Sequence, residues 1–400
     1  MKKRSTSSSV FKILAQYILL ILYMATFGLY VRLRYNLHRT DLSPIPKKGP
    51  FFLLGNHTNN FDGLFLQCMF LRNIRFVVTD GMFKNKTLAR LLNLVDYIPK
   101  RKSVSDPAAI RKIIELVKKG GIVGIFPEGG RNWDGMTGPI TPATFRLIDM
   151  MKIPVVVANI RGGYLSEPRW ADYKRRGRVD VHLKTVVEAG SNLSVPELEK
   201  RILEALAHNE YDWQNEVRIP YKGPGLCKGI ERLMFICPMC GSLGSVKSSD
   251  KDAWCVSCQA RFTLDVYGFL HTDSGLLPAD RLDDISKWQF ERLSDMFDES
   301  QQTVRLLADD GGILLSANKR EEPFKRVDGG KAILTRDHII IGRFVFNLAE
   351  MSGINVYFKS HLEFKYQSVD YRIGFESPHV SAYKWQCAVD LAKKRISAEV

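Results

Sequence analysis

Two polar motifs each directly follow a short apolar run, and together they constrain the fold more than any other feature of the sequence. Residues 51–54 (FFLL) lead into NHTNNFD at 56–62, and residues 122–125 (IVGI) lead into FPEGGR at 126–131. Short apolar runs bounded by turn residues are typical of buried strands. Because open α/β sheets bind ligands at the carboxyl ends of their strands, the two motifs predict an α/β domain with its site at that edge.

The first motif places His57 five residues before Asp62. On one helix these side chains would lie about 140° apart, so a loop that leads into a helix is needed to bring them together. The carboxylate could then fix the imidazole tautomer and stabilise the imidazolium, which makes His57 a candidate general base. Since no serine or cysteine lies in a nucleophile elbow, the residues favour a direct attack assisted by the base, without a covalent enzyme intermediate.

The second motif carries the candidate phosphate site. Gly129 and Gly130 allow close backbone approach and unusual dihedral angles, and Arg131 can bind a phosphate through two hydrogen bonds. The alternative interpretation of this second motif is a plain turn with a solvated ion pair. The alternative interpretation of the His57 and Asp62 spacing is a loop histidine near a helix start.

These two motifs, in this order, resemble those of the glycerophospholipid acyltransferases, the family that acylates lysophosphatidic acid. The resemblance covers residues 40–220 and implies catalytic roles for His57 and Asp62. It implies that Glu128, Gly129, Gly130 and Arg131 bind the acceptor. A looser match at 82–101 implies phosphate contacts for Lys84 and Arg101. The chain departs from the family pattern at Asn59, Asn60, Asp96, Gly130 and Asn132.

The N-terminal region predicts attachment to a membrane. Residues 13–31 are nearly all apolar, and as a helix they reach about 28 Å. Cations flank both ends, so the positive-inside rule leaves open whether the helix spans or only dips into the bilayer. A cleaved signal peptide and a buried soluble helix are the alternatives. We expect a membrane-associated protein of the bacterial inner membrane with its site facing the cytoplasm.

Two CxxC pairs indicate a structural zinc site. Cys237 and Cys240 are separated from Cys255 and Cys258 by fourteen residues, which is typical of a Cys₄ zinc ribbon. Four cysteine ligands leave no open coordination position. Three scattered cysteines complete a set of seven, which indicates a reducing compartment rather than a secreted disulfide framework. Two redox-active pairs without metal are the alternative.

The chain length of 400 residues predicts several domains. We expect an N-terminal membrane helix at 1–35, an α/β acyltransferase domain at 36–222, a zinc ribbon at 223–270 and a β-rich C-terminal domain at 271–400. Seven strands followed by a helix in the last part suggest a pleckstrin-homology or GRAM-like barrel. The predicted strands are 303–307, 312–316, 332–335, 338–341, 354–358, 362–365 and 371–375.

The predicted function is acyl transfer from acyl-CoA or acyl carrier protein to lysophosphatidic acid, which gives phosphatidic acid. The net charge of +15 fits anionic partners: membrane phospholipids, a lysophospholipid acceptor and an acidic thioester donor. Another lysophospholipid or glycerol 3-phosphate is an alternative acceptor. A membrane adaptor without catalysis is an alternative of a different class. Nucleic acid is disfavoured, because Lys247 and Lys251 near the cysteines are offset by Asp250 and Asp252.

Overall fold

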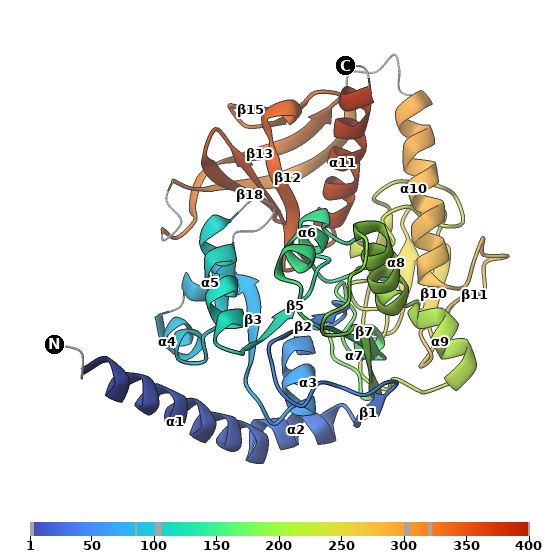
Figure 1. Ribbon diagram of the computed structural model, residues 1–400. Coiled ribbons are helices and arrows are strands. Elements are labelled where there is room, and N and C mark those ends of the chain that lie inside the picture. The colour runs from blue at the N-terminus through green and yellow to red at the C-terminus, as the bar shows by residue number, and fades with distance from the viewer. Residues whose placement is uncertain (1–3, 85, 101–105, 300–304, 319–321, 399–400) are drawn as a thin grey trace. The chain divides into compact units, whose positions relative to one another are not determined.

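The computed structural model describes residues 4–84, 86–100, 106–299, 305–318 and 322–398 (Figure 1). The chain divides into two compact units. The first unit comprises Met1–Pro168 and Arg175–Lys222, and the second comprises Arg169–Lys174 and Gly223–Val400. A short segment from the middle of the chain therefore belongs with the C-terminal part. The predicted four-part division remains a prediction within these two units.

The first unit is built on a seven-stranded sheet in the order β1-β7-β6-β2-β5-β3-β4. Strands β6, β2, β5, β3 and β4 are parallel, whereas β7 runs antiparallel to β6 and pairs in parallel with β1. The strands are β1 (Leu37–Asp41), β2 (Phe51–Gly55), β3 (Ile74–Thr79), β4 (Ile98–Lys100), β5 (Ile122–Ile125), β6 (Val155–Arg161) and β7 (Val179–Val187).

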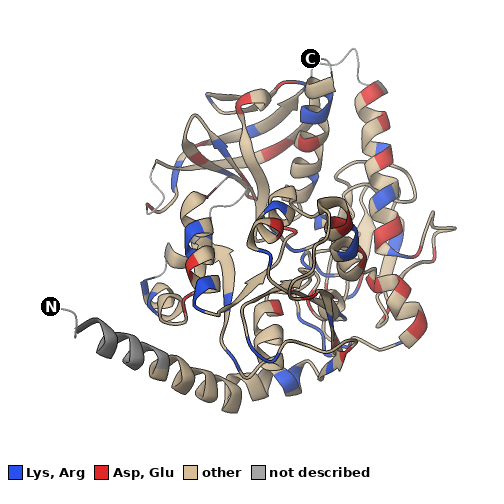
Figure 2. Cartoon of the chain, viewed as in Figure 1, with Lys and Arg blue, Asp and Glu red and all other residues tan. Residues whose placement is uncertain are grey.

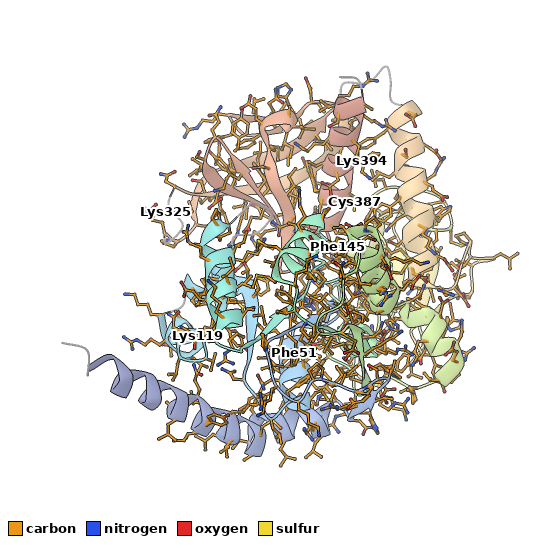
Figure 3. All side chains as sticks on the ribbon, viewed as in Figure 1. Phe51, Lys119, Phe145, Lys325, Cys387 and Lys394 are labelled. Atoms are coloured by element: carbon orange, nitrogen blue, oxygen red, sulfur yellow. The ribbon has the colours of Figure 1, made fainter. Side chains whose placement is uncertain are left out.

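Helices cover both faces of this sheet, as the side chains of the central strand β2 show. Phe51 and Leu53 pack into one buried apolar cluster, and Phe52 and Leu54 pack into the other. The alternation follows from the two-residue period of a strand. Phe145, which Figure 3 labels together with Phe51, lies in the second cluster. Burial on both faces explains why β2 is a continuous apolar run in the sequence.

The helices of the first unit begin where the sequence offers good start signals. Proline occupies the first turn of α5, α6 and α8, and the Asp106 side chain accepts a hydrogen bond from the Ala109 amide at the start of α5 (3.2 Å). The helices are α1 (Arg4–Ala25), α2 (Phe27–Arg34), α3 (Asp62–Met69), α4 (Lys86–Leu94), α5 (Pro107–Lys118), α6 (Pro142–Met151), α7 (Gly163–Ser166), α8 (Val195–Leu206) and α9 (Glu210–Val217).

The N-terminal helices make polar contacts with the rest of the first unit, and they also expose apolar side chains. Residues 14–25, the part of α1 that Figure 2 colours, contain no charged residue. Gln16 donates to the carbonyl of Leu94 and to the Asp96 carboxylate (both 2.8 Å), and the Tyr23 hydroxyl donates to the carbonyl of Leu64 (3.0 Å). Residues 14–34 are long and apolar enough to cross a membrane, although one such helix near an N-terminus is weak evidence by itself.

The second unit contains two separate sheets and two long helices. A four-stranded sheet in the order β11-β10-β9-β8 carries the cysteine pairs. A seven-stranded antiparallel sheet follows in the order β15-β14-β13-β12-β18-β17-β16. β12, the first of these strands in the chain, pairs with β18, the last. Helix α11 packs against this sheet, and Trp385 lies in the shared core with Cys387, the one of the two that Figure 3 labels.

The elements of the second unit have the following bounds. They are β8 (Val246–Ser248), β9 (Ala253–Cys255), β10 (Arg261–Leu264), β11 (Leu270–Thr272), α10 (Leu282–Glu299), β12 (Arg305–Ala317), β13 (Lys325–Thr335), β14 (His338–Ile341), β15 (Phe344–Asn347), β16 (Ser352–Tyr357), β17 (His361–Tyr366), β18 (Val369–Phe375) and α11 (Ala382–Ala398).

The count of seven strands in the C-terminal sheet is as expected, but the set differs. The predicted strands 303–307 and 312–316 belong to one long strand, β12, and residues 303 and 304 lie outside the described residues. The sequence at their junction resembles a turn because it contains Gly311 and Gly312. In the structure it is a β-bulge in which Asp310 and Gly311 lie opposite Lys331, with Gly311 at a φ of 67°. Strand β15 was not predicted, and with it the sheet again has seven strands.

Candidate functional site

The backbone of His57 is fixed from both sides at the carboxyl end of β2. Its N–H donates to the Glu128 carboxylate (2.6 Å), and its carbonyl accepts from the Asn132 amide (3.0 Å). One residue earlier, the Asn56 side chain exchanges two hydrogen bonds with the backbone of Ile160 on β6 (2.6 and 2.8 Å). The His57 loop is therefore held by the segments that follow β5 and by β6 itself.

The sequence-predicted pair is formed, because His57 Nδ1 lies 2.8 Å from Asp62 Oδ2. Asp62 is fully buried at the start of α3, whereas a quarter of the His57 side chain is exposed. An ionised carboxylate only accepts hydrogen bonds, so Nδ1 is the donor and the neutral ring keeps its lone pair on Nε2. The ring also stacks on Phe126, with centroids 4.7 Å apart. This arrangement holds an imidazole ready to remove a proton.

Asp62 also shapes the loop that precedes it. The backbone amides of Thr58 and Asn59 donate to the same Oδ2 (2.7 and 2.9 Å), and the Thr58 hydroxyl donates to Oδ1 (3.1 Å). A buried carboxylate is costly unless such donors surround it. The loop geometry that the spacing of His57 and Asp62 requires is thus produced by the carboxylate itself.

Glu128 contacts backbone rather than open space. Its Oε1 accepts from the His57 amide, and its Oε2 accepts from the Gly138 amide (2.7 Å). Burial raises the pKa of the Glu128 carboxyl to about 8, and the hydrogen bonds from Gly138 and His57 oppose that rise. The resemblance implies acceptor binding for Glu128, and the geometry adds a second possibility, that it joins the two motifs.

Arg131 lies in the same neighbourhood as the predicted base. Burial lowers the pKa of the Arg131 guanidinium, while the negative charges of Glu167 and Asp62 oppose that fall. Gly129 has a φ of 73°, so the turn before Arg131 uses a conformation that favours glycine. Lys84 and Arg101, the other predicted phosphate contacts, cannot be placed. The Lys84 side chain and the whole of Arg101 lie outside the described residues.

Sequence reasoning missed the support that comes from the end of β6 and α7. The Asn59 side chain donates to the carbonyl of Gly163 and to the Ser166 hydroxyl (both 3.0 Å), and the Asn60 side chain donates to Glu167 Oε1 (2.9 Å). The asparagines that depart from the family pattern are therefore partners of α7 and of Glu167. Neither Ser166 nor Glu167 stands in a recognisable motif, so no signal in the sequence pointed to them.

The four predicted metal ligands come together in the second unit. The Sγ atoms of Cys237, Cys240, Cys255 and Cys258 lie within 4.8 Å of one another. The pairs Cys237–Cys258 and Cys240–Cys255 are each 3.8 Å apart. A tetrahedral zinc ion with Zn–S bonds of about 2.3 Å separates its sulfur ligands by about 3.8 Å, so the cluster fits that group.

The two cysteine turns have the same backbone geometry. The amide of Gly241 donates to the carbonyl of Cys237, and the amide of Gln259 donates to that of Cys255 (both 2.9 Å). Gly241 and Gln259 both have a positive φ, of 72° and 64°. Matching turns of this kind present two thiols each to one point, which supports metal binding rather than two independent redox pairs.

Comparison with known proteins finds relatives of one part of the first unit. A model of the acyltransferase family matches residues 36–161, which include both motifs. This part of the chain is an acyltransferase-family domain. The resemblance to the glycerophospholipid acyltransferases is thereby confirmed for this domain, which carries His57, Asp62, Glu128 and Arg131.

Two curated relatives resemble the acyltransferase domain over part of their length. A chloroplastic 1-acyl-sn-glycerol-3-phosphate acyltransferase of Brassica napus is 26% identical over 136 residues, which are 32% of this chain and 39% of the relative. A 1-acyl-sn-glycerol-3-phosphate acyltransferase of Bacillus subtilis is 28% identical over 119 residues, which are 30% of this chain and 59% of the relative. The matched regions thus span between two fifths and three fifths of these relatives.

One solved structure is also similar to this chain. It is the crystal structure of the 1-acyl-sn-glycerophosphate acyltransferase of Thermotoga maritima, at 19% identity and a TM-score of 0.41. The match covers 52% of this chain and 82% of the other.

Replacing Asp62 with asparagine tests the base geometry of the acyltransferase domain. The amide carries no negative charge to stabilise the imidazolium, and its NH₂ group can occupy either oxygen position, so the fixed tautomer is no longer enforced. We expect the turnover number for acyl transfer to fall by about 10³- to 10⁴-fold, with the acceptor KM nearly unchanged. Steady-state kinetics check this, with Asp149→Asn as the control, because Asp149 pairs with Lys152 on the surface. Wild-type turnover in Asp62→Asn would contradict it.

Replacing Glu128 with glutamine tests the buried carboxyl. Its folded-state pKa of about 8 lies above the ordinary value of 4.5, so between these values the folded protein binds more protons than the unfolded chain. Its free energy of unfolding therefore decreases as pH rises through this window, by up to about 1.4 kcal/mol per pH unit. We expect Glu128→Gln to lose that part of the slope between pH 5.5 and 7.5 in denaturant unfolding. An identical slope in both proteins would refute it.

Proposed function

We propose that the chain transfers an acyl group from a thioester donor to the free hydroxyl of lysophosphatidic acid, giving phosphatidic acid. The observation that carries this proposal is the His57–Asp62 pair, which keeps Nε2 available as a base at the end of β2. The acyltransferase-family match and the names of the two curated relatives support the same reaction.

The mechanism is a direct attack in two stages. His57 Nε2 removes the proton from the acceptor hydroxyl as the oxygen attacks the thioester carbonyl carbon. The tetrahedral intermediate then collapses, the carbon–sulfur bond breaks, and the sulfur takes the proton from the imidazolium to leave as a thiol. Asp62 stabilises the imidazolium between these stages, because its buried carboxylate already accepts from Nδ1. No acyl-enzyme forms in this scheme.

Arg131 is proposed to bind the acceptor phosphate. A guanidinium is suited to a phosphate because it can donate two parallel hydrogen bonds. Its partial burial would strengthen that attraction, since charges interact more strongly where water is excluded. Lys84 and Arg101 remain proposed as further phosphate contacts, and Gly129 and Gly130 as the turn that lets the lipid approach the backbone.

The N-terminal helices are proposed to attach the acyltransferase domain to a membrane whose cytoplasmic face supplies the substrates. The contacts of Gln16 and Tyr23 to the first unit favour a helix that lies in one leaflet over one that crosses the bilayer. Leu14, Ile18, Ile21 and Leu22 are about half exposed or more, which gives this helix an apolar face for acyl chains. Acyl-CoA and acyl carrier protein both remain candidate donors.

The acyl-transfer proposal is tested with purified full-length protein, lysophosphatidic acid and acyl-CoA, with phosphatidic acid followed by mass spectrometry. We expect His57→Ala to abolish turnover because the base is lost. Arg131→Ala should raise the acceptor KM, whereas Arg146→Ala, which changes an exposed arginine on α6, should not.

Other outcomes discriminate among the alternatives. Product only with acyl carrier protein, another lysophospholipid or glycerol 3-phosphate would change the assigned substrate and keep the chemistry. Absence of product with all of these would make a membrane adaptor without catalysis the leading function.

We also propose that the cysteine cluster binds a structural zinc ion. Four thiolates would complete the coordination shell, so the ion would stabilise the fold and take no part in acyl transfer. A seven-stranded sheet against which α11 packs, and in which β12 and β18, the first and last strands along the chain, pair with each other, supports a domain of the pleckstrin-homology or GRAM kind.

Cys237→Ser tests the metal proposal. Loss of one thiolate should release the ion and lower the soluble yield several-fold, while the turnover number of the folded fraction stays close to that of the wild type. Elemental analysis and purified yield measure the two effects. Cys227→Ser is the matched control, because Cys227 is buried in the same unit outside the cluster. Full stability of zinc-free protein would contradict a structural role.

A further inference from the structure

The loop that follows the second motif is held by the chain that links α8 to α9. The amide of Thr137 donates to the carbonyl of His208 (3.0 Å), and the His208 amide donates back to the Thr137 hydroxyl (3.0 Å). That hydroxyl also donates to the carbonyl of Leu206 (2.9 Å). Residues 135–138 and 206–210, called the clasp below, are therefore joined through backbone groups.

The clasp contains a completely buried acid, Glu210. Its amide donates to the carbonyl of Gly135 (3.0 Å), and its Oε2 lies 2.6 Å from His208 Nε2. Its Oε1 accepts from the amide of Leu165 on α7 (3.4 Å). A buried carboxylate is costly unless donors surround it. Because the donors to its two oxygens come from different segments, Glu210 links the clasp to α7.

Helix α7 in turn contacts the loop that carries the base. The Asn59 side chain donates to the carbonyl of Gly163 and to the Ser166 hydroxyl (both 3.0 Å). Gly163 packs so closely against this loop that a Cβ atom there would lie 2.2 Å from the Thr58 hydroxyl oxygen. The amides of Thr58 and Asn59 both donate to Asp62. One side of the loop is therefore held by α7.

The other side of the same loop is held through Glu128. Its carboxylate accepts from the amide of His57 (2.6 Å) and from the amide of Gly138 in the clasp (2.7 Å). The hydrogen bonds run from the His57 loop to Glu128, along the clasp to Glu210, and through α7 back to Asn59. They form a closed ring, all of whose members belong to the first unit. A shift of the His57 loop must therefore strain or break a bond of this ring.

We propose that Thr137 and Glu210 are positioning residues for His57, because each holds one side of the clasp within the ring. Thr137 fixes the segment that presents the Gly138 amide to Glu128, and Glu210 fixes the clasp to α7. This inference rests on the proposed acyl transfer, in which a misplacement of the base by about 1 Å costs about 10²-fold in rate. Both residues act only through their hydrogen-bonded neighbours.

Thr137→Val is the first test, because valine keeps the shape of threonine and removes the hydroxyl that pairs with two backbone groups. We expect the turnover number to fall by about ten- to hundredfold, with the acceptor KM within about twofold. Thr137→Ser keeps the hydroxyl and should recover most of the turnover. Ile202→Val is the control for lost packing, because Ile202 is buried in an apolar cluster of the same unit, outside the ring. Equal turnover in Thr137→Val and Thr137→Ser would overturn the proposal.

Glu210→Met tests the link to α7, because methionine has a similar volume but accepts neither hydrogen bond. The turnover number should again fall by about ten- to hundredfold. Glu210→Gln should recover most of it, since its carbonyl oxygen can accept from Leu165 and its NH₂ group can donate to the other tautomer of His208. Equal turnover in the two variants would overturn the role of Glu210. If Glu210→Met fails to fold, the two Thr137 variants decide, because that side chain is only partly buried.

A double-mutant cycle separates positioning from general destabilisation. If Thr137 acts through Glu128, combining Thr137→Val with Glu128→Gln should lower the turnover number by less than the product of the two single effects. Effects that multiply would mean that Thr137 acts by another route, and they would overturn the proposal.

Hydrogen exchange of the full chain tests the ring without substrate. In Thr137→Val and Glu210→Met, peptides covering residues 57–62 should exchange faster than in the wild type or in Ile202→Val, because their amides lose fixed acceptors. Unchanged exchange in these peptides would overturn the proposal. An inactive wild type whose variants still show the faster exchange would overturn the proposed reaction and support the ring, so the two failures are distinguishable.

Discussion

The burial of one carboxylate, that of Asp62, determines the form of the candidate site. A charge removed from water costs several kcal/mol unless hydrogen-bond donors replace the lost hydration. Here the donors are His57 Nδ1, two backbone amides and the Thr58 hydroxyl. Satisfying Asp62 therefore folds the loop, orients the imidazole and starts α3 at the same time. The base, its tautomer and the loop cannot be altered independently.

Much of the acyltransferase domain could be predicted because its sequence signals come from residues that are close together in the chain. The apolar runs at 51–54 and 122–125 are strands. The pairing of His57 with Asp62 followed from what a five-residue spacing requires. Strands β1 and β4 and helices α6, α7 and α9 were not predicted. β1 and β4 lie at the sheet edges, so few buried apolar residues marked them.

Other features depend on contacts between residues distant in sequence, and these were beyond local reasoning. Glu128 was expected to bind substrate, and its bonds to the amides of His57 and Gly138 join residues up to 71 positions apart. β12 was expected as two strands because a bulge with paired glycines resembles a turn. The cysteine cluster was simpler, since ligand spacing within each CxxC turn is local, and both turns have the expected form.

The order of the chain also separates the two ion-pair partners of Asp172 in time during synthesis. Arg232 follows Asp172 by 60 residues, whereas Lys359 follows it by 187 residues. At about 5–20 residues per second, a ribosome needs roughly 10–40 s to supply Lys359 after Asp172 has been made. Segment 169–174, which belongs to the second compact unit, can therefore complete its ion pairs only after most of that unit has been synthesised.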